Sequence, residues 1–528
     1  MAAASVIAAE NDAAFREALS ALTATNFKAK EQAASALAGI RHPGTRATLD
    51  ALLAGQLHYC REDQQVFIVE EGDAGLALTD PVTLQPAGVA AADDFARIAT
   101  NNRLRKALKG LIASFDLADP SPQVRLAAVT EMLRSMDEEG AAALRARYEN
   151  EDDDAVRDAI GIGLAVADLD SDSAQTRLAA IDTLRGSLNA DAYNRLTALL
   201  ATNDDGTPLE PDEEVRRAAA KAVGSIDASR RFYGTLETLF FGLSLGSVLV
   251  LAAIGLAITF GVMGVINMAH GELIMLGAYT TYVMQLLMPN QIGASVLIAV
   301  PAAFLVAASV GILIERGVVR FLYGRPLETL LATFGISLIL QQIVRDVFTA
   351  NNRPVETPPW MSGSLQINEA LSITYNRLYV VLFMLIVFAV LLWVLKRTTL
   401  GLKVRAVAQN RVMAKAMGVR TQWLDAMTFG LGSGIAGVAG VALSQLTNVG
   451  PNLGQSYIID SFMVVVFGGV GNLWGTLIGG MTLGVVNQVL EPYAGAVLAK
   501  ILVLIALILF IQRRPRGLFP QQGRAAEG

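Results

Sequence analysis

The sequence predicts an all-α chain in two parts, an N-terminal domain of helical repeats followed by a polytopic α-helical membrane domain. Residues 236–512 contain repeated apolar runs of 18 or more residues, the length that crosses the hydrocarbon layer. Residues 1–235 hold most of the acidic residues and many arginines, and one short pattern recurs there. We therefore place the boundary at residue 235 and expect the membrane domain over 236–520.

Composition excludes several kinds of site. The net charge is −6 over 528 residues, and no lysine and arginine run indicates a nucleic-acid surface. The single cysteine, Cys60, excludes an internal disulfide. His42, His58 and His270 are too far apart in sequence to form a metal-ligand motif, so we expect no metal and no cofactor. Residues 1–9 lack the basic start and apolar core of a secretory signal.

The recurring pattern is an arginine followed by small and apolar residues. Its arginines are separated by 32, 20 and 39 residues, so the repeat is degenerate. Small residues after each arginine allow close helix packing, and an Asp or Ser before each unit can cap its helix. The pattern resembles HEAT-like repeats, which stack into an α-solenoid; the alternative is an irregular helical bundle. The arginines are Arg125, Arg157, Arg177 and Arg216.

Two further segments of this half stand out. Residues 57–84 contain two short β-prone runs, which predict a small β-hairpin inserted in the helical domain. Basic residues gather over 103–109, where a solvated helix face is the simplest interpretation. No nucleophile–base pair or metal-ligand pattern is present, so the domain is expected to bind and not to catalyse.

Eight apolar segments are expected in the membrane half. They are 239–260, 272–288, 292–314, 327–349, 378–396, 424–446, 457–488 and 494–512. Basic residues concentrate after the third segment, between the fifth and sixth, and after the last, which places those loops in the cytoplasm. Counting crossings backward places the N-terminal domain outside, in the periplasm, although no signal is visible. The same count requires 457–488 to be a hairpin of two short helices or a re-entrant element, with a break near 467–475.

The stretch 261–272 interrupts the apolar region with glycines, Asn267, His270 and Glu272. Glu272 is the only formally charged residue over 238–314. Acid and imidazole groups are costly against lipid and usually face a cavity or another helix. A glycine-rich break is tolerated at membrane depth only where protein or water covers it. One interpretation is a broken helix that forms a wall of a transport path; the other is a tight cytosolic turn with Glu272 in water.

The break at 467–475 mirrors this stretch. Each break contains glycine and asparagine, and each apolar block has one internal acid, Glu272 in the first and Asp460 in the second. By the crossing count the two blocks run in opposite directions, as in the inverted repeats of transporters. Chance likeness between glycine-rich segments is the alternative, because small residues also serve helix packing.

The basic segment 397–418 is long enough for two short helices, and Gly418 is positioned to end the second. A loop in water has no need of its leucine, valines and methionines, so we expect these to pack on a partner or on the membrane domain itself. A phosphate-binding Gly-x-x-x-x-Gly-Lys-Ser/Thr loop is absent from the sequence, so any ATP-driven step requires another subunit.

Five motifs stand out in the membrane half. They are 261–272 with Gly277-Ala-Tyr279, Leu331-Ala-Thr-Phe-Gly-Ile-Ser337, Arg405-Ala-Val-Ala-Gln-Asn410, Ser461-Phe-Met-Val-Val-Val-Phe-Gly-Gly-Val-Gly-Asn472 and Arg514-Pro-Arg-Gly-Leu-Phe519. Together they resemble the branched-chain amino acid/urea permease family of ABC importers, over about residues 236–520. The long N-terminal domain is similar to the urea-transporting members, whereas the amino-acid permeases look shorter.

The resemblance implies a non-enzymatic subunit in the lipid of a bacterial inner membrane. Its implied partners are a second permease subunit, two ABC ATPase subunits and an extracytoplasmic substrate-binding protein. Residues 397–418 then correspond to the loop that docks on the ATPases. The docking residues expected there are Gly401, Arg405, Ala406, Gln409, Asn410, Val412, Met413 and Gly418.

The leading hypothesis is a permease for urea, a small neutral solute that needs amide, hydroxyl or carbonyl partners along its path. A branched-chain amino acid or short-amide permease, a passive urea channel and a membrane-anchored scaffold remain as alternatives. For every polar candidate, structural packing is the competing role. The substrate-path candidates are Asn267, His270, Glu272, Thr333, Ser337, Gln341, Asp460 and Asn472.

Overall fold

The computed structural model describes residues 2–40, 42–72, 75–134 and 138–519. They fall into two compact units, Met1–Ser229 and Arg230–Gly528, and each has hydrophobic clusters of its own. The chain is mainly helical, but the expectation of an all-α chain was too narrow, because the first unit also contains a five-stranded sheet.

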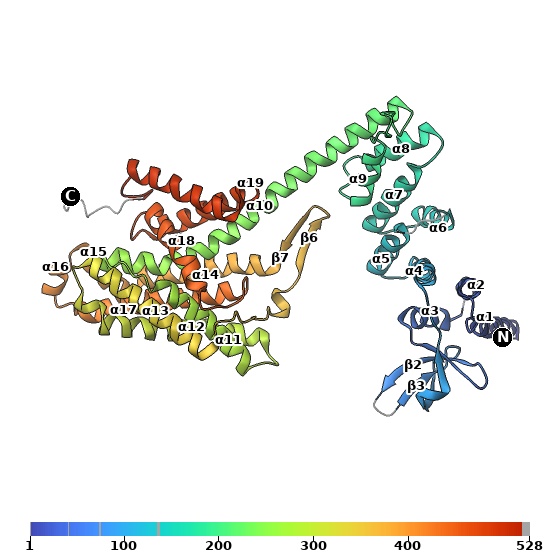
Figure 1. Ribbon diagram of the computed structural model, residues 1–528, viewed down its shortest axis with the longest axis horizontal. Coiled ribbons are helices and arrows are strands. Elements are labelled where there is room, and N and C mark those ends of the chain that lie inside the picture. The colour runs from blue at the N-terminus through green and yellow to red at the C-terminus, as the bar shows by residue number, and fades with distance from the viewer. Residues whose placement is uncertain (1, 41, 73–74, 135–137, 520–528) are drawn as a thin grey trace. The chain divides into compact units, whose positions relative to one another are not determined.

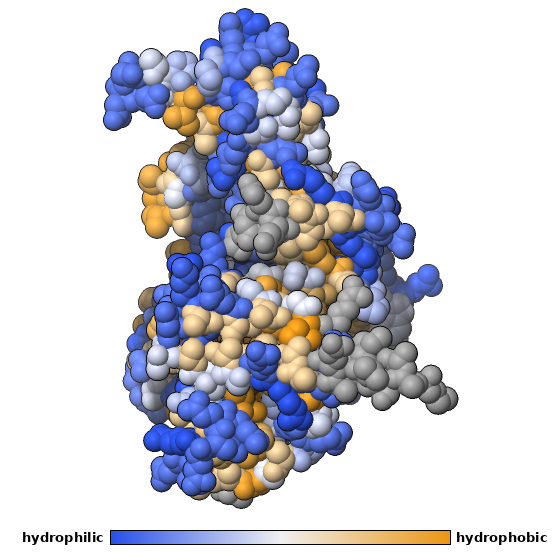
Figure 2. Space-filling view, turned by 90° about the vertical axis from the view of Figure 1, so that its right-hand side faces the viewer, coloured by the Kyte–Doolittle hydropathy of each residue, from blue (hydrophilic) through white to orange (hydrophobic). Residues whose placement is uncertain are grey.

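The N-terminal unit begins with three helices, continues into the sheet, and ends in a stack of helices α4 to α9 (Figure 1). The face shown in Figure 2 is largely hydrophilic with apolar residues interspersed. The helices are α1 Ala2–Ala21, α2 Phe27–Gly39, α3 Gly44–Ala54, α4 Asn102–Asp116, α5 Pro122–Leu133, α6 Glu138–Tyr148, α7 Asp154–Asp168, α8 Ala174–Leu184 and α9 Ala190–Ala198, and α10 Glu213–Met263 contributes its first part.

The expected hairpin is part of a larger antiparallel sheet with strand order β4-β3-β2-β1-β5. The two β-prone runs form β2 (Val66–Gly72) and β3 (Gly75–Thr79), whose Val69, Leu76 and Leu78 are buried. The remaining strands lack an alternating apolar pattern: β4 contains a proline and a glycine, and β5 has only three residues. They are β1 Leu57–Cys60, β4 Pro86–Ala90 and β5 Phe95–Arg97, with a 3-10 turn at Ala92–Asp94.

The four arginines of the recurring pattern make the same contact. Each lies in the first turn of a helix and donates a hydrogen bond to the backbone carbonyl six residues earlier, at distances such as 2.9 Å for Arg125 to Asp119 and 2.7 Å for Arg177 to Ser171. The expected caps are present before α7, α8 and α10, whereas Ser121 before α5 makes no capping hydrogen bond with its side chain. The recurring sequence therefore encodes a recurring way of holding the chain that enters each helix.

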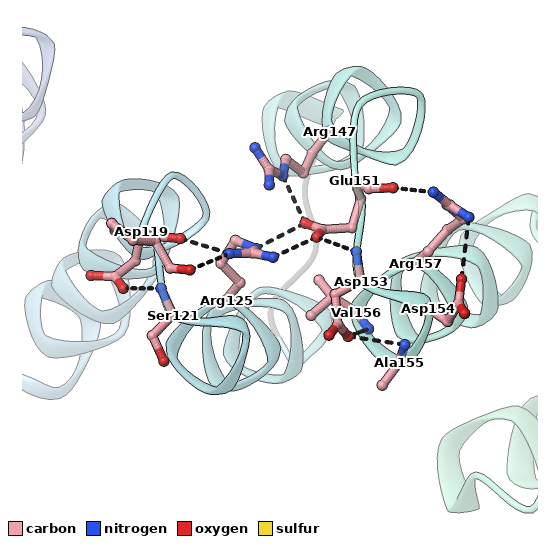
Figure 3. A network of polar contacts seen from close by, with 11 residues as sticks. Asp119, Ser121, Arg125, Arg147, Glu151, Asp153, Asp154, Ala155, Val156 and Arg157 are labelled. Carbon is pink, nitrogen blue, oxygen red and sulfur yellow. Dashed lines mark hydrogen bonds and ion pairs between the residues drawn. The ribbon is translucent and has the colours of Figure 1, made fainter.

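These contacts also join successive helices (Figure 3). The Arg125 guanidinium reaches the carboxylate of Glu151 with distances of 3.0 and 2.6 Å, and Arg147 donates to the same carboxylate at 2.8 Å. Glu151 is 1% exposed, and its own carbonyl accepts the hydrogen bond from Arg157. Arg177 and Glu210 repeat this link before α10. The hydrogen bond from Arg125 lowers the pKa of Glu151 to about 2, with Asp153 N–H and Arg147 adding to the effect.

This network predicts an acid-sensitive contribution to stability. The folded pKa of Glu151 lies below its unfolded value of about 4.3, so the contribution is complete above that value and lost as pH falls toward 2. In a fragment 10–228, Glu151→Gln should lower the melting temperature by about 5 °C at pH 7. Thermal melts by circular dichroism should show this difference narrowing below about pH 4 and closing near pH 2. The exposed neighbour Glu149→Gln is the control, and equal pH profiles for the two variants would contradict the assignment.

The second unit is a helical bundle from which a small β-hairpin projects (Figure 1). Among the described residues, six helices are long and apolar enough to cross a membrane, and α18 is a shorter apolar helix. The elements are the remainder of α10, α11 His270–Leu287, α12 Ile292–Gly317, α13 Pro326–Phe348, α14 Tyr375–Arg397, α15 Thr399–Gln409, α16 Arg411–Ala416, α17 Thr421–Ser444, α18 Leu453–Gly468 and α19 Leu473–Arg513, with 3-10 turns Val319–Phe321 and Pro359–Met361 and the hairpin β6 Ser364–Asn368 and β7 Leu371–Thr374.

The long apolar run 457–488 is broken where the sequence predicted. α18 ends at Gly468 and α19 begins at Leu473, and both Gly469 and Gly471 have positive φ. A second non-helical residue, Gly495, divides α19 into two parts. The chain beyond α19 returns to the break between α18 and α19, because Leu518 N–H donates to Phe467 O at 2.9 Å. The run therefore forms two helices joined by a tight turn.

Glycines let the central helices approach closely. α17 packs against both α11 and α12. A Cβ added to Gly277 of α11 would lie against the backbone of Gly437, and one added to Gly440 would lie against the backbone of Ile274 and Ala278. Such small-residue contacts are the usual way that helices associate in a membrane, where no hydrophobic driving force acts between them.

Candidate functional site

The stretch 261–272 is a helix break inside the membrane unit. α10 ends at Met263 and α11 begins at His270, and the residues between them are not helical. Gly264 has a φ of +68°, a left-handed conformation that favours glycine. The predicted interruption is therefore present, and its position agrees with the sequence.

The break turns back into the protein. The ring nitrogen Nε2 of His270 lies 2.8 Å from the carbonyl oxygen of Ala252, eleven residues before the end of α10. At the rise of an α-helix this is about 16 Å, roughly half the thickness of a hydrocarbon core. α11 thus starts near the middle of the membrane-spanning part of α10, with Asn267, His270 and Glu272 all buried. Glu272 is 1% exposed, which does not fit a turn with its carboxylate in water.

Two predicted residues of α13 bind the Glu272 carboxylate. Ser337 Oγ and Gln341 Nε2 both donate to Glu272 Oε1, at 2.9 and 2.7 Å. One turn earlier, Thr333 Oγ1 accepts a hydrogen bond from the N–H of Met268 at 3.1 Å, within the break. Thr333, Ser337 and Gln341 are spaced by four residues and therefore share one face of α13. Four candidates, Glu272, Thr333, Ser337 and Gln341, thus come together at one place, with Asn267 and His270 next to them along the chain.

This cluster places an acid with a free acceptor at the start of a helix. Glu272 lies in the first turn of α11, where the unpaired N–H groups and the helix dipole favour negative charge. Its second oxygen, Oε2, has no hydrogen-bond partner within the part of the chain that the structure describes, and neither does Asn267 Nδ2. A buried polar atom without a partner is costly, so these two atoms are suited to bind a polar molecule.

α13 has its polar side inward. Thr329, Thr333, Ser337 and Gln341 are buried, while its leucines, isoleucines and Phe334 are largely exposed. This reverses the pattern of a helix in a water-soluble protein and fits a helix with lipid or another subunit on its outer side.

Asp460 and Asn472 lie apart from this cluster. Asn472 Oδ1 accepts hydrogen bonds from the N–H groups of Trp474 and Gly475, so it caps α19. Asp460 in α18 is buried and accepts from Lys500 Nζ at 3.0 Å. The two breaks nevertheless meet, because a Cβ on Gly261 would lie against Gly471. The contacts of Asp460 and Asn472 are thus those of structural residues.

The basic segment forms the two short helices expected, α15 and α16. Asn410 caps α16 through the N–H of Met413 at 2.9 Å, and Gly418 follows it with a φ of +85°. Gly401 packs against the backbone of Leu395, and Val404 packs in a cluster with Leu424 of α17. Val404 therefore packs on the membrane domain itself, whereas Leu402, Val412, Met413 and Met417 are exposed, and their packing on a partner stays a prediction. Arg405, Ala406, Gln409 and Asn410 are also exposed.

The sequence reasoning missed a charged cluster beside this segment. Arg411 bonds both carboxylate oxygens of Asp425, and its guanidinium lies 4.4 Å from the ring centre of Tyr323. Glu315 is buried close by. The signal in the sequence was an acid at one end of each of two apolar runs. Glu315 lies at the end of α12, and Asp425 lies near the start of α17.

Comparison with known proteins places the membrane unit. The family model described as branched-chain amino acid transport system / permease component matches residues 238–511. The chain belongs to this family. The match supports the branched-chain amino acid permease part of the resemblance and does not distinguish the urea-transporting members. It makes the chain a transport permease with several membrane-spanning helices.

Relatives of this permease bear transport names. It is 31% identical over 301 residues to the high-affinity branched-chain amino acid transport system permease protein LivH of Salmonella typhimurium, an alignment that covers 55% of the chain and 97% of LivH. It is 30% identical over 297 residues to BraD of Pseudomonas aeruginosa, with 54% and 96% covered. The ribose import permease protein RbsC of Escherichia coli is 26% identical over 296 residues, with 52% and 86% covered. No solved structure matches the permease.

Proposed function

We propose that this permease is the membrane subunit of an ABC importer that moves urea across the bacterial inner membrane. The observation that carries the proposal is the buried Glu272 carboxylate at the start of α11, where Ser337 and Gln341 occupy one oxygen and the other lacks a partner. Intramembrane acids at a helix break commonly mark a transport path. Asn267, His270 and Thr333 complete the wall of this path.

Urea fits the chemistry of this wall. It is neutral, and it carries amide N–H donors and one carbonyl acceptor. Glu272 Oε2 offers an acceptor, and the amide of Asn267 offers a donor, and both residues are buried. The unit that precedes the permease domain adds support, because the urea-transporting members of this family resemble the chain in this respect. The runner-up substrate is a branched-chain amino acid, which the names of LivH and BraD favour.

Partner subunits supply the energy. A neutral solute gains nothing from the membrane potential, because that work scales with the charge moved. The sequence has no phosphate-binding loop, so we assign ATP hydrolysis to two ABC ATPase subunits. A second permease subunit and an extracytoplasmic substrate-binding protein complete the complex, and lipid surrounds it. We assign α15 and α16 as the surface on which the ATPases dock, on account of their exposed apolar residues.

The N-terminal unit is proposed to be a HEAT-like solenoid on the periplasmic side. The support is the recurring arginine contact at the helix starts and the carboxylates that join successive helices. The basic loops of the membrane unit support the periplasmic assignment, since they mark the cytoplasmic ends of its helices. On this arrangement the unit is available to the substrate-binding protein.

Uptake of labelled urea tests the substrate. In cells that lack other urea transporters, deletion of this gene should abolish urea uptake at low external concentration and leave leucine uptake unchanged. The measurement is the initial rate of [14C]urea and [14C]leucine entry, with and without the gene restored. Intact urea uptake combined with lost leucine uptake would make the amino-acid permease the correct assignment, and ATP-independent urea entry would indicate a channel.

Cross-linking tests the docking surface. Val412 and Met413 are 81% and 61% exposed on α16. A cysteine at either position should form a cross-link to an ATPase subunit in isolated membranes. The matched control is a cysteine at Trp393, an exposed residue of α14 that we assign to lipid and that should not react with the ATPase. Cross-links that remain within the permease chain would count against the docking surface.

A further inference from the structure

The charged cluster beside α16 joins the proposed docking surface to the membrane helices. Arg411 is the first residue of α16 and lies next to the exposed Val412 and Met413. Its Nη1 donates to Asp425 Oδ1 at 3.0 Å and its Nη2 donates to Asp425 Oδ2, so the guanidinium makes a bidentate ion pair with the carboxylate. Asp425 is 2% exposed. A paired fork of this kind fixes orientation as well as distance.

The surroundings of this ion pair resist its separation. Glu315 in the last turn of α12 is buried, and its Oε2 has no hydrogen-bond partner among the described residues and lies 3.8 Å from Arg316 Nε. The Arg316 guanidinium in turn lies 4.7 Å from the ring centre of Trp423. Withdrawal of Arg411 would leave the Asp425 carboxylate buried close to that of Glu315. The Arg411 side chain is 38% exposed, but Asp425 is buried, and a buried carboxylate that loses its cation is destabilised, so α16 and α17 are expected to move together.

α17 carries such a movement to the site. Gly440 lies fifteen residues beyond Asp425, about 22 Å along the helix. There its missing side chain allows contact with the backbone of Ile274 and Ala278 of α11, the helix that begins with the Glu272 cluster. Gly437 makes the same close approach to Gly277. A rigid helix with backbone contacts at its far end transmits a displacement without loss in flexible side chains.

We propose that the Arg411–Asp425 pair is the link through which displacement of α16 moves α17 and, through it, the α11 wall that carries Glu272. Arg411 is a positioning residue and does not touch the solute. The inference rests on the proposed function to the extent that ATPase subunits displace α16.

The test uses the full complex with its partner subunits in proteoliposomes. The variants are Arg411→Gln, Arg411→Lys and the exchanged pair Arg411→Asp with Asp425→Arg. The control is Arg325→Gln, which removes an arginine from an exposed pair with Glu328 in the loop before α13. Two readouts are compared: the [14C]urea or [14C]leucine imported per ATP hydrolysed, and the ATP-induced change in Trp423 fluorescence, identified by its loss in Trp423→Phe. The second readout reports on the inner end of α17 and requires no transported solute.

Arg411→Gln should retain ATP hydrolysis, import about tenfold less solute per ATP and lose the Trp423 signal. The exchanged pair should restore at least half of both, and Arg325→Gln should match the wild type. If Arg411→Gln fails to assemble, Arg411→Lys decides, because lysine keeps the charge but cannot fork and should lower both readouts severalfold.

The link would be overturned if Arg411→Gln, or Arg411→Lys where Arg411→Gln fails to assemble, gave wild-type values of both readouts. It would also be overturned if the exchanged pair assembled but restored neither the import per ATP nor the Trp423 signal. A wild-type complex that imports neither solute would instead refute the proposed function, and the Trp423 signal would still show whether Arg411 moves α17.

Discussion

Glu272→Gln should reduce the rate of solute uptake by about 10- to 100-fold without preventing assembly. Glutamine keeps the shape of the side chain and can still accept from Ser337 and Gln341 through its carbonyl oxygen. It replaces the free acceptor Oε2 with a donor and removes the charge at the start of α11. The loss of one hydrogen bond to a charged group corresponds to about 1.5–3 kcal/mol, which gives that range of rates. The measurement is the initial rate of labelled-urea entry at equal amounts of permease in the membrane.

The matched control is Glu328→Gln, an exposed carboxylate at the start of the same α13 that contacts Glu272. It should leave uptake unchanged. Ser337→Ala and Gln341→Leu should both lower uptake, because each removes a donor from a buried carboxylate. If Glu272→Gln assembles and transports at the wild-type rate across a range of pH, the cluster is part of the packing and the path lies elsewhere.

Gly277→Val should prevent the membrane unit from folding. The missing Cβ of Gly277 is directed at the backbone of Gly437, which cannot rotate away as a side chain would. A branched side chain there must separate α11 from α17, and overpacking costs of about 1–3 kcal/mol are exceeded where only backbone can move. We expect little or no folded permease in the membrane. The amount is measured by size-exclusion chromatography of detergent extracts.

Gly335→Ala is the control for this prediction. Gly335 also lies within a membrane helix, α13, but a Cβ there meets no atom within 4 Å. Alanine favours a helix by up to about 1 kcal/mol relative to glycine, so this variant should be as abundant as the wild type or more so. Equal amounts of folded Gly277→Val and wild-type permease would show that α11 and α17 are not as closely packed as described.

The helix break and the membrane segments were predictable because their physical causes are local. A lone acid in an apolar run, glycines at a turn and runs of 18 or more apolar residues are properties of the chain itself. The arginine pattern was visible for the same reason, although its meaning was not. The contact that each arginine makes with the carbonyl six residues earlier follows from the helix start, whereas the link from Arg125 to Glu151 spans 26 residues.

The five-stranded sheet was only partly predictable. β2 begins with four consecutive apolar residues and β3 has apolar residues that alternate, but β1, β4 and β5 are held by their neighbours in the sheet. Short strands with proline or glycine have little preference of their own and form where a paired edge is available. Asn472 was assigned to the substrate path, but it caps α19. The sequence does not distinguish an asparagine that caps a helix from one that faces a solute.

The sequence by itself determined three things. The second half of the chain is a membrane domain that resembles the permease family, its helices are interrupted at two glycine-rich breaks, and Glu272 is an unusual charge within an apolar segment. Only the tertiary structure decided what surrounds that charge. It brought Ser337 and Gln341 to one oxygen from 65 and 69 residues away, and it placed Arg411 on Asp425. The physical reason is that local composition sets helix and break, whereas the partners of a buried polar group depend on which helices can approach. Gly277, Gly437 and Gly440 set one such approach, that of α11 to α17.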